Sequence, residues 1–236
     1  MWLKTATLAL IPALVIQGSR VQKNTIRLPE PSGERKGITG QGRPLSLLIL
    51  GDSAAAGVGV EHQQDALLGA MIAELKHQYQ LHWCLEAQSG NNTAQVIHQT
   101  QKLSNQKYDV VVTSVGVNDV TKLMSAQKWI KQQQQFYQLI QDKFQPELII
   151  ATGVPPMHLF PALPNPLAWL FGQYAQQMNQ KLAQFVAQHD AMQWIEYDIQ
   201  KYQSMNLEMA KDGFHPSKEI YKIWGKDVAD RVLAWF

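Results

Sequence analysis

Four short polar motifs stand at intervals along the chain, and three of them directly follow short apolar runs. The first is Gly51-Asp52-Ser53, which follows residues 45–50 and precedes three alanines. The others are Ser89-Gly90-Asn91-Asn92, Gly116-Val117-Asn118-Asp119 and Asp212-Gly213-Phe214-His215-Pro216. Each motif taken singly is also typical of a turn, so the functional interpretation depends on their combination.

The residue types in these motifs suit nucleophilic catalysis. With Asp212 three residues before His215, its carboxylate can accept the imidazole Nδ1–H and leave Nε2 free to take a proton. Ser53, with small neighbours, would be the nucleophile that this base activates. The Asn118 amide can donate to a developing oxyanion, and Gly90 can turn its backbone N–H toward a ligand. The pattern predicts Ser53, Asp212 and His215 as catalytic residues.

The remaining candidate groups are assigned other roles. Asp52 and Asp119 neighbour the predicted site, and we expect them to shape loops as hydrogen-bond acceptors. His158 is an alternative base, but it lies in an apolar stretch without a carboxylate nearby in sequence. Cys84 is the one cysteine and lies in an apolar run, which favours a buried thiol. The seven histidines are scattered, so no metal and no cofactor are expected.

The elements between the motifs predict how they meet. Apolar runs indicate strands over 45–50, 81–87, 109–115, 148–152 and 193–197. Helical periodicity indicates helices over 65–78, 93–103, 125–144 and 168–189, with a last helix that begins near Ser217. Strands that alternate with helices predict an α/β fold, with a parallel sheet covered on both faces. The carboxyl ends of such strands share one edge, where ligands bind, so the motifs should gather there.

The ordered set of motifs resembles the SGNH hydrolase family, also called the GDSL esterase/lipase family. The match covers about residues 45–236. The resemblance implies a flavodoxin-like three-layer α/β/α sandwich with a five-stranded parallel sheet. It also implies an oxyanion hole made by the Ser53 and Gly90 backbone N–H groups and the Asn118 side chain. The glycine motif around Gly90 is the loosest of the matches.

A long apolar loop follows the fourth predicted strand. It runs from Val154 to Leu167 and contains five prolines. We expect either that it forms a wall of an acyl pocket, with contacts from Met157, Phe160 and Leu163, or that it packs over the end of the sheet. An apolar wall would favour a fatty acyl ester or a lysophospholipid over a small acetylated sugar.

Several functions fit the same residues. The first is a serine esterase, lipase or lysophospholipase that works through a Ser53 acyl-enzyme. An acyl or acetyl transferase, or a carbohydrate acetylesterase, would use the same scaffold with a different acceptor or alcohol. A catalytically silent binding module need not keep the whole set of side chains. A nucleotide-binding protein of the flavodoxin type would need a phosphate-cradling pattern, which the loop after residue 50 lacks.

The N-terminal part carries a different signal. We expect a hydrophobic segment over residues 1–19, a linker over 20–44 that is rich in Pro and Gly, and an esterase domain over 45–236. The uncharged run from Thr5 to Ile16 suits a membrane-associated segment, a cleaved signal or a helix packed on the domain. A cell-envelope location, exported or membrane-associated through residues 2–16, is therefore favoured over a cytoplasmic one. The net charge of +2 without basic runs argues against a nucleic-acid partner and leaves a small-molecule or lipid ester.

Overall fold

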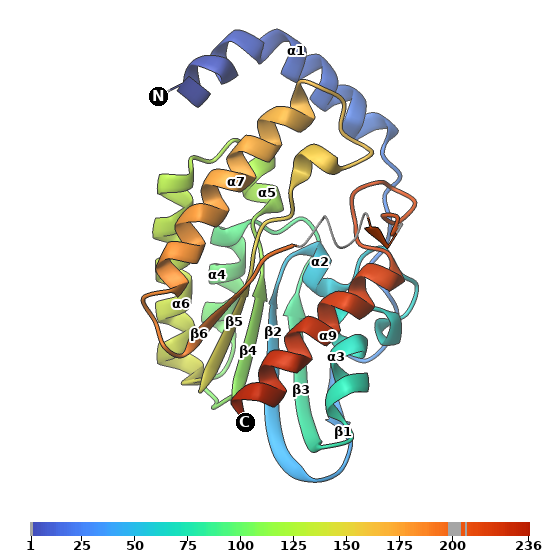
Figure 1. Cartoon of the computed structure of the whole chain (residues 1–236), viewed down its shortest axis with the longest axis vertical. Coiled ribbons are helices and arrows are strands. Elements are labelled where there is room, and N and C mark those ends of the chain that lie inside the picture. The colour runs from blue at the N-terminus through green and yellow to red at the C-terminus, as the bar shows by residue number, and fades with distance from the viewer. Residues whose placement is uncertain (1, 198–203, 206) are drawn as a thin grey trace.

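A computed structural model describes residues 2–197, 204–205 and 207–236 of the chain. Its centre is a six-stranded sheet with the order β1-β3-β2-β4-β5-β6 (Figure 1). Five strands are parallel, as predicted, and β1 joins β3 in the antiparallel direction. The strands are β1 (Lys36–Thr39), β2 (Arg43–Gly51), β3 (Tyr79–Ala87), β4 (Val110–Ser114), β5 (Leu148–Thr152) and β6 (Met192–Ile195).

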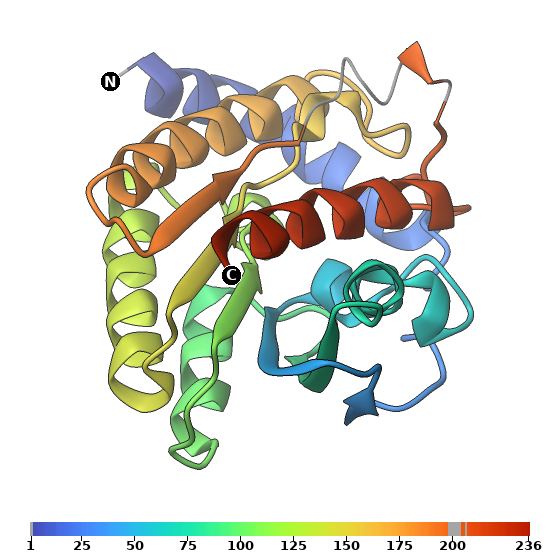
Figure 2. The ribbon, with the colours of Figure 1, turned by 60° about the horizontal axis from the view of Figure 1, so that its bottom comes forward.

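Helices cover both faces of this sheet, so the predicted three-layer α/β fold is confirmed (Figure 2). One face packs against α3 (Leu67–Leu75) and α9 (Lys218–Trp235), which contact each other. The other face packs against α4 (Thr93–Lys102), α6 (Ala126–Phe144) and α7 (Leu167–Val186). The short segments are α2 (Ser53–Ala56), α5 (Val117–Thr121), η1 (Gln63–Asp65) and η2 (Met157–Leu159). Ser217 caps α9 through its hydroxyl, which accepts from the Ile220 N–H.

Alternation along the strands divides the buried side chains into two cores. In β2, Leu48 and Leu50 belong to the core beneath α4, α6 and α7, while Leu47 and Ile49 face α3 and α9. Successive side chains of a strand point to opposite faces, so a strand buried on both faces reads as a continuous apolar run. Because each such side chain removes apolar area from water, each stabilises the fold by about 1.5–3 kcal/mol.

The N-terminal part differs from the expected segment and linker. A single helix, α1 (Trp2–Asn24), packs on α7, so the helix continues beyond residue 19. Residues 20–44 contain the end of this helix, strand β1 and the start of β2, and therefore are not an unstructured linker. The glycines and prolines there mark turns between short elements rather than a loose connection. None of the described helices is long and apolar enough to cross a membrane.

Truncation of the two sheet faces should be about equally costly. Leu48 and Ile49 are both completely buried, on opposite faces. We expect Leu48→Ala and Ile49→Ala each to lower the free energy of unfolding by about 2–5 kcal/mol, through lost burial and a residual cavity. Urea denaturation followed by circular dichroism measures this.

Ile38 offers a matched control on the same sheet. Like Ile49, it is a β-branched residue in a strand, but its side chain is 63% exposed on β1. Ile38→Thr should change the unfolding free energy by about 0.5 kcal/mol or less. A large loss there, or no loss at Leu48 and Ile49, would contradict this description of the core.

Candidate active site

Ser53 lies at the carboxyl edge of the sheet, where β2 passes into α2. β2 ends at Gly51, and a side chain there would lie 2.1 Å from the Ser114 carbonyl oxygen, so the close approach of β2 and β4 requires glycine. Asp52 caps α2, since its carboxylate accepts from the Ala54 N–H at 3.2 Å. Ser53 is therefore the first residue of a short helix, with its hydroxyl held just beyond the sheet.

His215 and Asp212 form the compact turn that their spacing predicted. One Asp212 oxygen, Oδ1, accepts from the backbone N–H groups of Phe214 and His215, at 2.9 and 3.0 Å. The other, Oδ2, lies 2.5 Å from His215 Nδ1. Burial alone would raise the pKa of Asp212, but these hydrogen bonds outweigh it and hold the pKa below its ordinary value. The carboxylate is thus ionised and able to accept only.

The three side chains form a continuous hydrogen-bonded chain. His215 Nε2 lies 2.9 Å from Ser53 Oγ. Because the Asp212 carboxylate can only accept, Nδ1 of the neutral ring must carry the proton, and Nε2 accepts from the Ser53 hydroxyl. The structure therefore brings together the serine, histidine and aspartate that the sequence singled out.

Gly59 allows the two halves of this arrangement to approach each other. Its φ is +118°, and a side chain on it would lie 2.2 Å from the Pro216 carbonyl oxygen. The backbone after α2 thus runs directly against the backbone after His215. Any side chain at this position would push the Ser53 and His215 segments apart.

The loops that carry Gly90 and Asn118 flank Ser53 on both sides. β2 pairs with β3 on one side and β4 on the other, and Gly51 is in register with both Ala87 and Ser114. The two loops also touch each other, because Asn118 Nδ2 donates to the Asn91 carbonyl oxygen at 2.9 Å. Gly90 itself has a left-handed φ of +83°.

The carboxylates next to the motifs hold these loops, as expected. Asp119 is buried, and its Oδ2 accepts from both the backbone N–H and the hydroxyl of Thr93, at 3.0 and 2.7 Å. Trp129 and Gln133 donate to the same hydroxyl. Burial raises the pKa of Asp119. The network ties the start of α4 to α5 behind the two loops.

Two residues that hold the site were not found from the sequence. Glu30 accepts from the Ser89 N–H at 2.7 Å and pairs with Arg35 at 2.7 Å, so the predicted linker braces the loop of Gly90. Tyr221 is fully buried, and its hydroxyl donates to the carbonyl oxygens of Ala54 and Val58. Neither carried a local signal, since Glu30 is an isolated acid and Tyr221 lies within an apolar helix stripe.

A small apolar pocket adjoins Ser53 and His215. Its volume is about 50 Å³, and the apolar side chains around it include Val117, Phe160 and Phe214. The two phenylalanine rings meet edge to face, with centroids 5.5 Å apart. Such a pocket accepts a few water molecules or a short acyl group.

Of the three expected acyl contacts, Phe160 alone lines this pocket. Met157 is completely buried in the core, and Leu163 lines a separate hollow beside the end of α1. The expected wall is therefore smaller than predicted, because Met157 and Leu163 lie away from this pocket. His158 lines a different pocket, along α7, which Ser53, Asp212 and His215 do not line.

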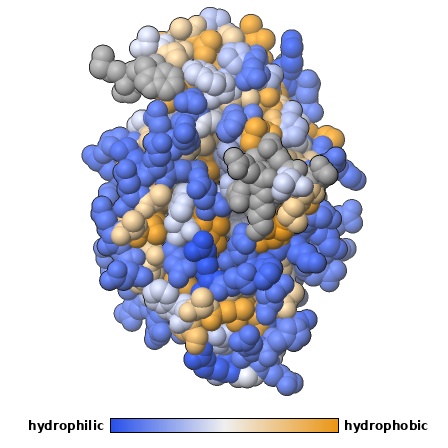
Figure 3. Space-filling model, in the orientation of Figure 1, coloured by the Kyte–Doolittle hydropathy of each residue, from blue (hydrophilic) through white to orange (hydrophobic). Residues whose placement is uncertain are grey.

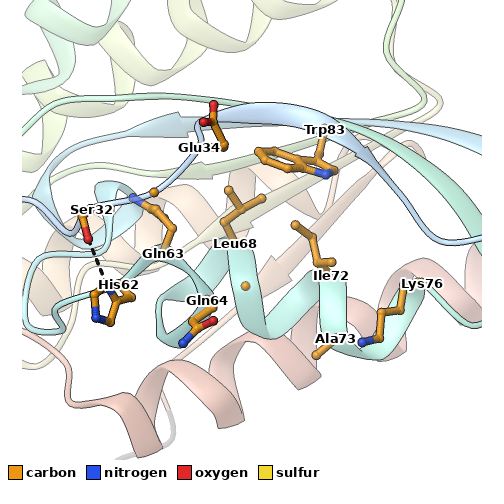
Figure 4. A pocket seen from close by; sticks show the side chains of 12 residues that line it. Ser32, Glu34, His62, Gln63, Gln64, Leu68, Ile72, Ala73, Lys76 and Trp83 are labelled. Carbon is orange, nitrogen blue, oxygen red and sulfur yellow. Dashed lines mark hydrogen bonds between the residues drawn. The ribbon is translucent and has the colours of Figure 1, made fainter.

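A larger open pocket of about 670 Å³ lies elsewhere, beside α3 and β3. Figure 4 shows Ser32 Oγ in a hydrogen bond with His62 Nδ1, and their distance is 2.9 Å. Glu34 lies apart from this pair in the same view. Within the described residues, no carboxylate hydrogen bonds to His62, so the pair lacks the orienting group that His215 has. The described residues also contain no group of three or more His, Cys, Asp or Glu side chains placed to hold a metal ion.

The comparisons with known proteins agree with this arrangement. The GDSL-like Lipase/Acylhydrolase family matches residues 49–223, which is most of the chain. The protein is therefore a member of the GDSL-like lipase/acylhydrolase family. A search of curated protein sequences gave no match.

Solved structures share the fold at low sequence identity. The lipase Lip_vut3 from a goat rumen metagenome is 16% identical, with a TM-score of 0.60 over 81% of this chain and 98% of that one. A G-D-S-L family lipolytic protein from Veillonella parvula is 12% identical, with a TM-score of 0.64 over 79% and 97%. Est24, a carbohydrate acetylesterase from Sinorhizobium meliloti, is 16% identical, with a TM-score of 0.58 over 81% and 100%.

The buried Asp52 should make stability depend on pH. Burial raises its pKa from 3.8 to about 7, against the lowering effects of the Ala54 N–H and of His215. Between about pH 4 and pH 7 the folded state therefore keeps a proton that the unfolded state has lost. We expect the contribution of Asp52 to the free energy of unfolding to fall by about 4 kcal/mol as the pH rises through this window, and to level off above it.

Asp52→Asn tests this dependence directly. The amide keeps an oxygen acceptor for the Ala54 N–H but does not titrate, so the difference between the wild type and the variant should grow from pH 4 to pH 8 in favour of the variant. Chemical denaturation at a series of pH values measures it. Asp190→Asn, at an exposed position, is the control and should show no such trend. A constant difference for Asp52→Asn would contradict the raised pKa.

Proposed function

We propose that the protein hydrolyses carboxylic esters through an acyl-enzyme on Ser53. The observation that carries the proposal is the hydrogen-bonded chain from Asp212 through His215 to the Ser53 hydroxyl. In the first step, Ser53 Oγ attacks the ester carbonyl carbon while His215 Nε2 takes the hydroxyl proton. His215 then returns that proton to the departing alcohol. Water repeats the sequence on the acyl-enzyme and releases the carboxylic acid.

The same proposal assigns the oxyanion hole to the loops on either side of Ser53. The backbone N–H groups of Ser53 and Gly90 and the side chain of Asn118 would donate to the oxyanion. The Asn118 amide carries two N–H bonds, so its bond to the Asn91 carbonyl leaves the second for the substrate. Donors that are already fixed by the fold need no reorganisation as charge develops.

Substitution of the proposed nucleophile should abolish turnover. Ser53→Ala is expected to lower kcat for p-nitrophenyl acetate by about 10⁴-fold or more, since the variant lacks the hydroxyl that forms the proposed acyl-enzyme. It should also abolish labelling by a fluorophosphonate probe. Ser89→Ala, in a neighbouring loop, is the matched control. If Ser53→Ala remains folded by circular dichroism and keeps its activity, the proposed role is wrong.

The size of the pocket bears on the acyl group. About 50 Å³ between Phe160 and Phe214 favours a short acyl chain over the fatty acyl chain expected from the sequence. The fold shared with a carbohydrate acetylesterase is compatible with acetyl esters. We therefore propose short-chain esters as the substrate class, with the alcohol part of the ester facing the solvent.

A chain-length series tests the acyl preference. We expect kcat/KM for p-nitrophenyl esters to be highest for acetyl to butyryl and to fall by about tenfold or more at octanoyl, since longer chains would displace the rings. Phe160→Ala should enlarge the pocket and shift the optimum toward longer chains. Met157→Leu, at a buried position outside the pocket, should leave the profile unchanged. An optimum at octanoyl or above in the wild type would overturn the short-chain assignment without affecting Ser53.

A further inference from the structure

Helix α1 is bound to the rest of the protein along one side. Leu3 and Leu14 are buried in the core shared with α7. The Thr7 hydroxyl lies 3.3 Å from the Tyr174 hydroxyl, and the Gln17 side chain donates to one backbone carbonyl of the loop before α7 and accepts from the first N–H of that helix. One side of α1 is therefore fixed against the protein by both apolar and polar contacts.

The opposite side of α1 carries large apolar side chains in contact with solvent. Leu8, Ile11, Val15 and Ile16 are 68%, 46%, 62% and 61% exposed. Their spacing places them on one stripe of the helix. Figure 3 shows hydrophobic atoms gathered at the top of the molecule, where Figure 1 places α1. An exposed apolar patch of this kind marks a binding surface.

The charged residues of α1 and of the chain up to residue 29 are all positive. Arg20, Lys23 and Arg27 are exposed at its carboxyl end. The sequence has no Asp or Glu before Glu30, although acids and bases are nearly balanced over the whole chain. Along the sequence, the apolar stripe is thus flanked by cations alone. This combination fits an anionic lipid surface, since apolar side chains enter the interface while cations meet the phosphate groups.

The position of α1 relates this surface to the active site. In Figure 1, α1 lies beyond the carboxyl ends of the strands, on the same side of the sheet as α2, which begins at Ser53. Its carboxyl-terminal part, together with residues 161–164, lines a hollow that Asp212 also lines. A membrane bound to α1 would therefore lie near the edge of the sheet that holds the proposed catalytic chain.

We propose that the outer face of α1 docks onto the surface of a bilayer that contains anionic lipids. Leu8, Ile11, Val15 and Ile16 would enter the interface, and Arg20, Lys23 and Arg27 would bind the head groups. The contacts of α1 with α7 stay intact in this arrangement, because the docking face is the one they leave exposed.

The test uses the full chain and vesicles of defined composition. Co-sedimentation with phosphatidylcholine vesicles that contain phosphatidylglycerol should show binding, with much weaker binding to phosphatidylcholine alone. Leu8→Gln with Val15→Gln should weaken binding by about tenfold or more. Ile38→Gln with Trp235→Gln removes two exposed apolar side chains away from α1 and should leave binding unchanged. Circular dichroism and thermal melting check that each variant is folded.

Charge variants separate a local from a general attraction. Arg20→Gln, Lys23→Gln and Arg27→Gln together should weaken binding by about a hundredfold. Lys102→Gln, Lys128→Gln and Lys131→Gln remove the same charge from exposed positions on α4 and α6 and should have little effect. Equal losses in the two triple variants, or no binding to anionic vesicles, would overturn the proposal.

Two further readouts complete the test. Sedimentation velocity that shows a dimer abolished by the α1 variants, without vesicle binding, would assign the face to a second copy and overturn the proposal. Ser53→Ala should bind vesicles as the wild type does, so a failure of the esterase proposal and a failure of membrane docking are distinguishable.

Discussion

The hydrogen bond between His215 Nε2 and Ser53 Oγ joins segments that are 162 residues apart in sequence. Four of the six strands, β3 to β6, lie between them along the chain, so the bond exists because parallel strands deliver their carboxyl ends to one edge. The backbone contact between Gly59 and Pro216 and the two hydrogen bonds of Tyr221 hold α9 and the loop around α2 in the required positions. The geometry of the site is therefore a property of the packed domain rather than of the motifs themselves.

The buried carboxylates that hold this geometry lower the stability of the fold at the carboxyl edge of the sheet. Asp52 and Asp119 are carboxylates taken out of water, and burial raises the pKa of both. Each accepts hydrogen bonds from the loops that it shapes, which fixes the loops and offsets part of the cost of burial. The apolar cores on the two faces of the sheet supply the stabilisation that offsets this cost. Sites of this kind keep fixed dipoles where charge develops, and they do so at the expense of the surrounding fold.

Local patterns were sufficient for the fold class and for the order of the elements. Apolar runs such as 45–50 and 109–115 predicted buried parallel strands, because a strand covered on both faces carries apolar side chains on both of them. The three-residue spacing of Asp212 and His215 predicted their turn, since both ends of that contact are local. The motifs at Ser53 and Asn118 predicted their place at the sheet edge through the strands before them.

Features that depend on long-range packing could not be predicted in the same way. The hydrogen bond from Ser89 to Glu30 spans 59 residues and has no sequence signature. The positions of Met157 in the core and of Leu163 beside α1 were not predictable, because composition shows that a loop is apolar but not which way its side chains point. Strand β1 was missed because it is only four residues long, includes Gly37, and forms by pairing with β3, which is distant in sequence.

The two outermost strands of the sheet have a consequence for how the protein behaves at high concentration. β1 and β6 are each four residues long, whereas β2 and β3, at nine residues, lie inside the sheet. Short border strands present few unpaired backbone groups to another chain, so edge-to-edge association of the kind that begins fibril growth has little template here. Deletion of residues 36–39 would uncover the nine-residue strand β3 behind them and create such a template.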